Sequence, residues 1–276
     1  MKYVFLSIAA LAVIFGLSFL ITGIIRKKLK KKPPVSVHIL IGIAAGLLVI
    51  CGAFFVYAGI HYSADDEALA VWAESGSVRV TEIDSAYMVD GKGEDTALVF
   101  YPGAKVESEA YLPLMKKLAE NGIDCFLLKP PMRMAIFDMN AAERIIEKYD
   151  YQSWLLSGHS MGGIAAASCA ANNSDVVDGV VLLASYPNEA IPDDIRLLSI
   201  YGSEDKVLNR DAYEKAKSNY PANADEVVID GGNHAQFGNY GIQSGDGNAT
   251  ITREEQQKKT VDAILSFVQK VSFVTM

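Results

Sequence analysis

Five consecutive residues, Gly158-His159-Ser160-Met161-Gly162, form the pattern Gly-x-Ser-x-Gly. They follow a short apolar stretch and precede a run of small residues. A serine hydroxyl becomes an effective nucleophile when a sharp turn lifts it from the backbone and a base takes its proton, and flanking glycines permit such a turn. Ser160 is therefore the candidate nucleophile. The alternative is a glycine-rich strand-to-helix turn in which Ser160 only caps the helix.

The segments around this motif alternate between strand-like and helix-like patterns from about residue 76 onward. Such alternation is typical of a mostly parallel sheet with helices on both faces. The expected strands are 77–83, 86–89, 96–101, 124–129, 153–157, 176–184, 196–201 and 226–229. The expected helices are 107–121, 137–149, 161–172, 211–218 and 253–271. The motif thus falls between the fifth strand and the third helix.

This arrangement resembles the α/β-hydrolase fold, and more narrowly its compact bacterial esterase-like and lipase-like members with a short cap. The resemblance covers about residues 76–271. It implies a serine hydrolase whose nucleophile, acid and histidine follow one another in the chain, each after a late strand.

The resemblance implies that Asp205, after the seventh expected strand, and His234, after the eighth, complete a catalytic triad with Ser160. His234 would take the proton of Ser160 and return it to the leaving group, while Asp205 would hold the tautomer of His234. Glu204 and Asp230 are the alternatives for the acid.

The other three histidines of the chain are poorer candidates for the base. His38 lies in an apolar segment and His61 at its edge, while His159 adjoins the nucleophile on the other side of the turn. His234 therefore remains the expected base.

An oxyanion hole requires backbone N–H groups that point at the developing negative charge. Met161 N–H is the first by position. The family carries its second donor after the strand that here ends at Tyr101, which indicates Ala104 N–H. Pro102 stands where the family commonly has histidine, but the donor is a backbone group. Tyr111, Lys105 and Phe237 are further candidates for the lining of the site, and residues 237–250 form either its rim or a solvated loop.

Charge and cysteine content exclude several classes of function. All 33 Asp and Glu residues lie beyond residue 32, where they face 18 Lys and Arg. Such a surface repels phosphate backbones, so no nucleic-acid partner is expected. The three cysteines have no Cys-x-x-Cys spacing, and neither a disulfide framework, a metal site nor a cofactor is expected.

Residues 3–25 and 35–60 carry no Asp, Glu, Lys or Arg, and each stretch is long enough to cross a bilayer as a helix. The basic loop 26–34 between them favours a cytoplasmic position for that loop. The sequence contains no cleavage site of small residues before the basic loop, so a removed signal peptide is not expected. The expected organisation is a two-span anchor in the cell membrane (1–62), a linker (63–75) and an extracytoplasmic hydrolase domain (76–276).

The expected function is cleavage of small or medium carboxylic esters through an acyl-enzyme, with a small-molecule ester as substrate and the lipid bilayer as the partner of the anchor. A peptidase or amidase would use the same triad. A non-catalytic, membrane-anchored binding module is the alternative from another class. A transporter or sensor is disfavoured, since no charge lies within the expected spans.

Overall fold

The computed structural model describes residues 2–29, 34–73, 76–93 and 95–272. The chain divides into two compact units, Met1–Ile60 and His61–Met276. Each unit is considered by itself.

The first unit consists of two helices, α1 (Lys2–Lys28) and α2 (Val35–Gly59). Gly42 and Gly46, one turn apart on α2, pack so closely against the rings of Phe19 and Phe15 of α1 that a Cβ at either glycine would overlap the facing ring. Within the described residues, α2 is the one helix both long and apolar enough to cross a membrane, with a mean hydropathy of 2.8. Residues 30–33 of the expected basic loop lie outside the described residues.

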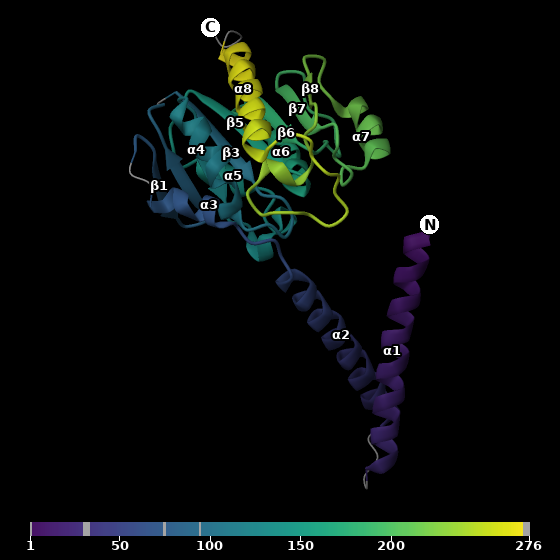
Figure 1. Ribbon diagram of the computed structural model, residues 1–276. Helices are drawn as coiled ribbons and strands as arrows, with labels where there is room; N and C mark the ends of the chain where they lie inside the picture. Colours follow the sequence, from purple (N-terminus) through teal and green to yellow (C-terminus); the bar gives the residue numbers. More distant parts are fainter. Residues whose placement is uncertain (1, 30–33, 74–75, 94, 273–276) are drawn as a thin grey trace. The chain divides into compact units, whose positions relative to one another are not determined.

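The second unit is built on an eight-stranded sheet with the order β1-β2-β4-β3-β5-β6-β7-β8 (Figure 1). The pairs β1–β2 and β2–β4 are antiparallel, and every other pair is parallel. Each expected strand is present. The strands are β1 (Arg79–Ile83), β2 (Ala86–Asp90), β3 (Thr96–Tyr101), β4 (Asp124–Leu128), β5 (Ser153–His159), β6 (Gly179–Leu183), β7 (Arg196–Gly202) and β8 (Asp225–Ile229).

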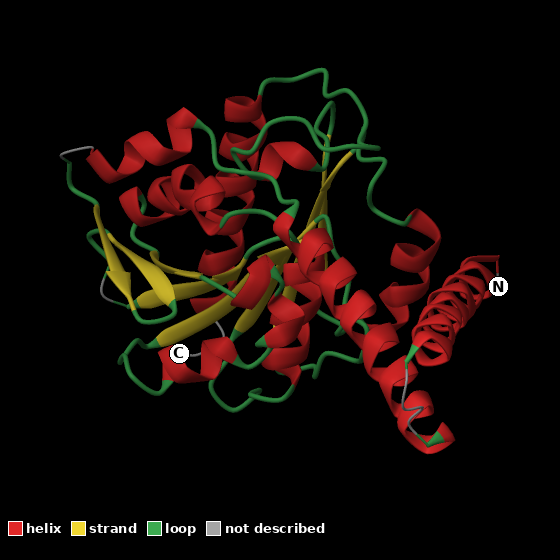
Figure 2. Cartoon of the chain, turned by 90° about the horizontal axis from the view of Figure 1, so that it is seen from below, coloured by secondary structure: helices red, strands yellow, loops and turns green. Residues whose placement is uncertain are grey.

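Helices cover both faces of this sheet (Figure 2). Alternate residues of β3 enter different cores: Leu98 and Phe100 pack in the cluster that includes the helices 112–120 and 253–272, while Ala97 and Val99 pack in the cluster that includes the helices 141–146 and 161–171. A central strand covered on both faces is apolar along its whole length, as β3 is. The helices of the unit are α3 (Asp66–Ala70), α4 (Leu112–Glu120), α5 (Ala141–Ile146), α6 (Met161–Ala171), α7 (Arg210–Ala216) and α8 (Arg253–Ser272).

Two expected helices are shorter than predicted. The stretch 107–121 begins with a 3-10 turn, Ser108–Tyr111, and becomes α-helical only at Leu112, with Pro113 in the first turn. The stretch 137–149 is α-helical only over Ala141–Ile146. It is interrupted because Asp138 has a non-helical backbone, with φ −156° and ψ 60°.

The stretch 63–75, expected to be a linker, differs from the prediction. Residues 61–70, here called the N-terminal strap, belong to the second unit and pack on the rest of it. The Asp65 side chain accepts a hydrogen bond from Ala68 N at the start of α3 and pairs with Arg253 of α8 at 2.6 Å. Asp65 N also donates to Asn239 O at 2.9 Å. The sequence gives no sign of this packing, because the partners are more than 170 residues away.

Candidate active site

Ser160 lies in the turn between β5 and α6, with φ 55° and ψ −123°. A positive φ is uncommon for a residue with a side chain, so the surrounding structure must hold it. Ser160 N donates to Leu183 O at 2.9 Å, and the hydroxyl of Ser185 donates to Ser160 O at 2.6 Å. These two bonds fix the backbone on both sides of the strained residue and leave the side chain partly exposed.

The two glycines of the motif are required by close backbone approach. A Cβ at Gly162 would overlap the carbonyl oxygens of Tyr101 and Pro102, and a Cβ at Gly158 would overlap the backbone of Gly162. The start of α6 is therefore pressed against the end of β3. This contact brings the Ser160 turn next to the loop that contains Ala104.

Asp205 and His234 are joined by a hydrogen bond of 2.8 Å between Oδ2 and Nδ1. Both side chains are almost completely buried, with 0% and 2% exposure. The other carboxylate oxygen of Asp205 accepts from Val207 N at 2.9 Å and Leu208 N at 2.8 Å. Because an ionised carboxylate only accepts, the proton of the neutral His234 ring lies on Nδ1 and the lone pair on Nε2.

The structure does not join His234 to Ser160 by a hydrogen bond. His234 Nε2 is buried and has no partner among the described residues. The ring of His159, the residue before Ser160, lies against the ring of His234 with centroids 4.5 Å apart. The ring of His234 thus contacts the residue next to the candidate nucleophile, and its Nε2 has no hydrogen-bond partner among the described residues.

The remaining acid and lining candidates have other positions. The Glu204 carboxylate accepts from its neighbour Ser203, and Asp230 is exposed. Phe237 and Tyr111 are fully buried, so they belong to the core and not to an open pocket wall.

The loop after β3 contains three consecutive backbone N–H groups that differ in their hydrogen bonds. Gly103 N donates to the Tyr111 hydroxyl at 3.1 Å, and Lys105 N donates to Arg133 O at 2.8 Å. Among the described residues, Ala104 N–H between them has no partner, and neither has Met161 N–H at the start of α6. These are the two donors expected from the sequence.

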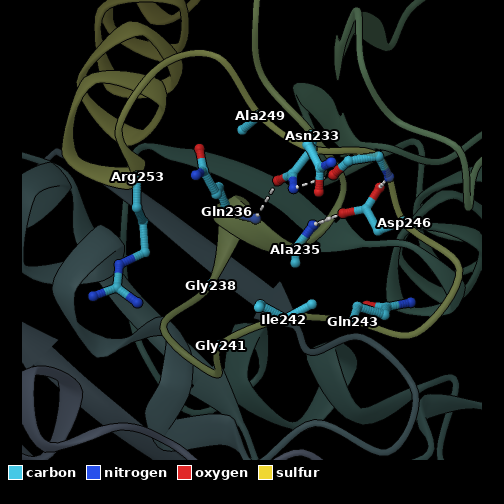
Figure 3. A pocket seen from close by; sticks show the side chains of 12 residues that line it. Asn233, Ala235, Gln236, Gly238, Gly241, Ile242, Gln243, Asp246, Ala249 and Arg253 are labelled. Atoms are coloured by element: carbon cyan, nitrogen blue, oxygen red, sulfur yellow. Dashed lines mark hydrogen bonds between the residues drawn. The ribbon is translucent and has the colours of Figure 1, made fainter.

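Residues 237–250 are tied to the loop that carries His234. Asp246 accepts from Ala235 N at 2.9 Å with one oxygen and from Gly247 N at 2.8 Å with the other (Figure 3). Asn233 donates through its amide to Gly247 O at 2.9 Å. The loop borders a hollow of about 300 Å³, whose lining includes Gln236, Ile242, Asp246 and Arg253.

Two further groups at the site make contacts that the sequence did not predict. Tyr111 OH lies 2.8 Å from His159 Nδ1, although Tyr111 reads as a core position at the start of a helix. Asp246 lies in a stretch of glycines and polar residues that is typical of a solvated loop. The sequence around Tyr111 or Asp246 does not predict these contacts, because the partner of each lies elsewhere in the chain. Within the described residues, no group of three or more His, Cys, Asp or Glu has the arrangement of a metal site.

Comparison with known proteins places this site in a fold family. Residues 97–258 match the model of the alpha/beta hydrolase family. No curated protein sequence gives a significant match. The mouse alpha/beta hydrolase domain-containing protein 10 superposes with a TM-score of 0.52 and 10% identity, over 71% of this chain and 100% of that one. A dienelactone hydrolase from Anabaena variabilis superposes with a TM-score of 0.52 and 13% identity, over 69% of this chain and 99% of that one.

A mutant epoxide hydrolase from Vigna radiata superposes with a TM-score of 0.51 and 12% identity, over 70% of this chain and 98% of the other. At these identities the superpositions show the shared fold alone. The family match spans more than half of the chain and includes Ser160, Asp205 and His234. The chain therefore belongs to the alpha/beta hydrolase family.

Proposed function

We propose that the protein is a serine hydrolase that cleaves carboxylic esters of small or medium acyl groups through an acyl-enzyme. Ser160 is the nucleophile, His234 the base, Asp205 the acid, and Met161 N–H and Ala104 N–H are the oxyanion donors. The observation that carries the proposal is the 2.8 Å bond between His234 Nδ1 and Asp205 Oδ2, which leaves Nε2 as the acceptor of a ring that packs against His159, the residue next to Ser160.

In the first step, Ser160 Oγ forms a bond to the ester carbonyl carbon while its proton passes to His234 Nε2. The carbonyl oxygen becomes an oxyanion, which the two N–H groups stabilise. The carbon–oxygen bond to the leaving alcohol then breaks, and the alcohol takes the proton from His234. Water repeats the sequence on the acyl-enzyme, which releases the acid and restores Ser160.

A fluorophosphonate probe tests the nucleophile directly, because it forms a stable bond only with an activated serine. We expect the full-length chain in detergent to be labelled, and Ser160→Ala and His234→Ala to be unlabelled and inactive toward short-chain p-nitrophenyl esters. Ser168→Ala is the matched control, since Ser168 lies on the same helix and donates to Glu189. A folded wild-type chain that takes up no probe would contradict the proposal.

We further propose that residues 1–60 form a two-span membrane anchor and that the hydrolase unit lies outside the cytoplasm. The length and apolar composition of α2, and the close packing of its Gly42 and Gly46 on α1, support a hairpin. Arg26, Lys27 and Lys28 at the end of α1 support a cytoplasmic position for the connecting loop.

A further inference from the structure

Tyr111 is a fully buried tyrosine whose hydroxyl contacts two parts of the candidate site. It accepts a hydrogen bond from Gly103 N at 3.1 Å and lies 2.8 Å from His159 Nδ1. The hydroxyl has one proton to donate, and Gly103 N can only donate. Among the described residues, His159 Nδ1 is the one acceptor within hydrogen-bond distance of this buried hydroxyl, so we assign the hydroxyl as the donor and place the proton of the neutral His159 ring on Nε2.

His159 is held neutral beside the proposed base. Burial lowers the pKa of His159 well below its usual 6.5, and the nearby charge of a protonated His234 lowers it further; the His234 carbonyl offsets only part of this. The two rings are 4.5 Å apart between centroids, with 48° between their planes. An uncharged ring thus packs against His234 where a charged one would oppose the imidazolium that forms during catalysis.

The contact between Tyr111, His159 and the loop after β3 is tight. A Cβ at Gly103 would lie 2.9 Å from both His159 Nδ1 and Tyr111 Oη. Both atoms belong to buried side chains that cannot easily move away. With Lys105 N bound to Arg133 O, the loop is fixed on both sides of Ala104 N–H.

We propose that Tyr111 and His159 are positioning residues that orient the oxyanion loop and the base together. The Tyr111 hydroxyl fixes the direction of Ala104 N–H through Gly103, and the His159 ring sets the plane of His234. This inference rests on the proposed function, because it assigns the pair to the same site. Neither residue touches the reacting atoms.

The test removes the Tyr111 hydroxyl by the substitution Tyr111→Phe. In full-length Tyr111→Phe, active sites are counted by fluorophosphonate labelling. We expect kcat to fall about 10- to 100-fold and KM to stay within about twofold, because Ala104 N–H remains present but points in a less favourable direction. A boronic acid that forms a tetrahedral adduct with Ser160 should bind more weakly by a similar factor. Tyr213→Phe is the matched control: Tyr213 is also fully buried, and its hydroxyl bonds Ser199 and Glu226.

Two more variants separate positioning from loss of stability. Gly103→Ala should reproduce the kcat defect, since the φ of Gly103 is not in the left-handed region and only the clash with Tyr111 and His159 is added. His159→Asn should keep an acceptor near Nδ1 for the hydroxyl and lose the ring that faces His234, with an intermediate defect. Imidazole nitrogen NMR should show His159 protonated on Nε2 in the wild type, a state that Tyr111→Phe should disturb.

The outcomes distinguish the two proposals. An unlabelled, folded wild type removes the hydrolase and the positioning role together. A labelled wild type with unchanged kcat per active site and unchanged boronic acid affinity in Tyr111→Phe overturns the positioning role and leaves the hydrolase intact. A defect of the same size in Tyr213→Phe would also overturn it, because a general loss of packing would then explain both.

Discussion

Asp205 uses its two oxygens for different tasks. One accepts from His234, and the other accepts from two backbone N–H groups of its own turn, at Val207 and Leu208. The turn fixes the carboxylate before it meets the ring, so the tautomer of His234 follows from the backbone after β7. The neighbouring Glu204, on the same loop, accepts instead from the Ser203 hydroxyl at 3.3 Å.

His159 gives a prediction on stability and pH. The folded chain keeps the ring neutral, whereas the unfolded chain binds a proton below about its usual pKa of 6.5. The unfolded state then binds more protons, so the free energy of unfolding falls as pH drops below that value, by up to ~1.4 kcal/mol per pH unit. His159→Asn should remove this slope.

The buried thiols of Cys125 and Cys169 provide the readout, since they react only when the second unit opens. In a Cys51→Ser background, urea-dependent thiol labelling should give unfolding free energies that fall more steeply toward pH 5 in the wild type than in His159→Asn. Equal slopes would show that His159 titrates normally in the fold.

At the scale of elements, the N-terminal strap connects the two loops that carry the site. Tyr62 pairs with Val106 in a parallel bridge, donating to Lys105 O at 2.7 Å and accepting from Glu107 N at 3.0 Å. Its ring also lies 5.6 Å from that of Tyr240, on the loop after His234. The strap thus lies beside the loop after β3 and pairs with it through this one bridge.

Glu107 strengthens this connection. Burial raises the pKa of its carboxyl, but the Ala64 N–H and the nearby His61 and Arg133 outweigh that effect and bring the pKa below the usual 4.5. The carboxylate therefore stabilises the strap above about that pH, and this contribution is lost as pH falls through the lowered pKa.

The strap predicts where an active fragment must begin. A chain that starts at His61 should fold and hydrolyse esters at the full-length rate, whereas one that starts at Gly76 should be less stable by on the order of 4 kcal/mol, since it loses several hydrogen bonds and the burial of Val71. Its kcat should fall as well. Thermal unfolding and ester hydrolysis of the two fragments check this.

Tyr62→Ala in the longer fragment is the companion variant, because it removes the ring that packs against Tyr240 and keeps the backbone bridge to Val106. It should lower kcat in the same direction as the truncation. Two fragments of equal activity and stability would show that residues 61–75 are a passive connection.

At the scale of the whole molecule, the proposed topology separates a basic cytoplasmic loop from an acidic external unit. Cysteine accessibility tests it in a Cys51→Ser chain, since Cys125 and Cys169 are buried. A membrane-impermeant maleimide should label Ser218→Cys, on the exposed surface of the second unit, in intact cells. Lys28→Cys should be labelled only after the membrane is opened. The reverse pattern would overturn the orientation.

The sequence by itself predicted the sheet, its eight strands and the places of Ser160, Asp205 and His234. The strands and the Gly-x-Ser-x-Gly motif follow from local information, because buried strands are apolar throughout and the motif stands at a strand-to-helix turn, whereas Asp205 and His234 follow from the family resemblance. The expectation for α2 is local in the same sense, because length and apolar composition alone make it able to cross a membrane.

Tertiary structure alone decided the rest. The hydrogen bond between Asp205 and His234, the contacts of Tyr111 with Gly103 and His159, and the packing of the strap all join residues far apart in the chain. Such contacts leave no periodicity or spacing in the sequence. They depend on which loops the parallel strands bring to the same edge of the sheet, and only the folded chain fixes those distances.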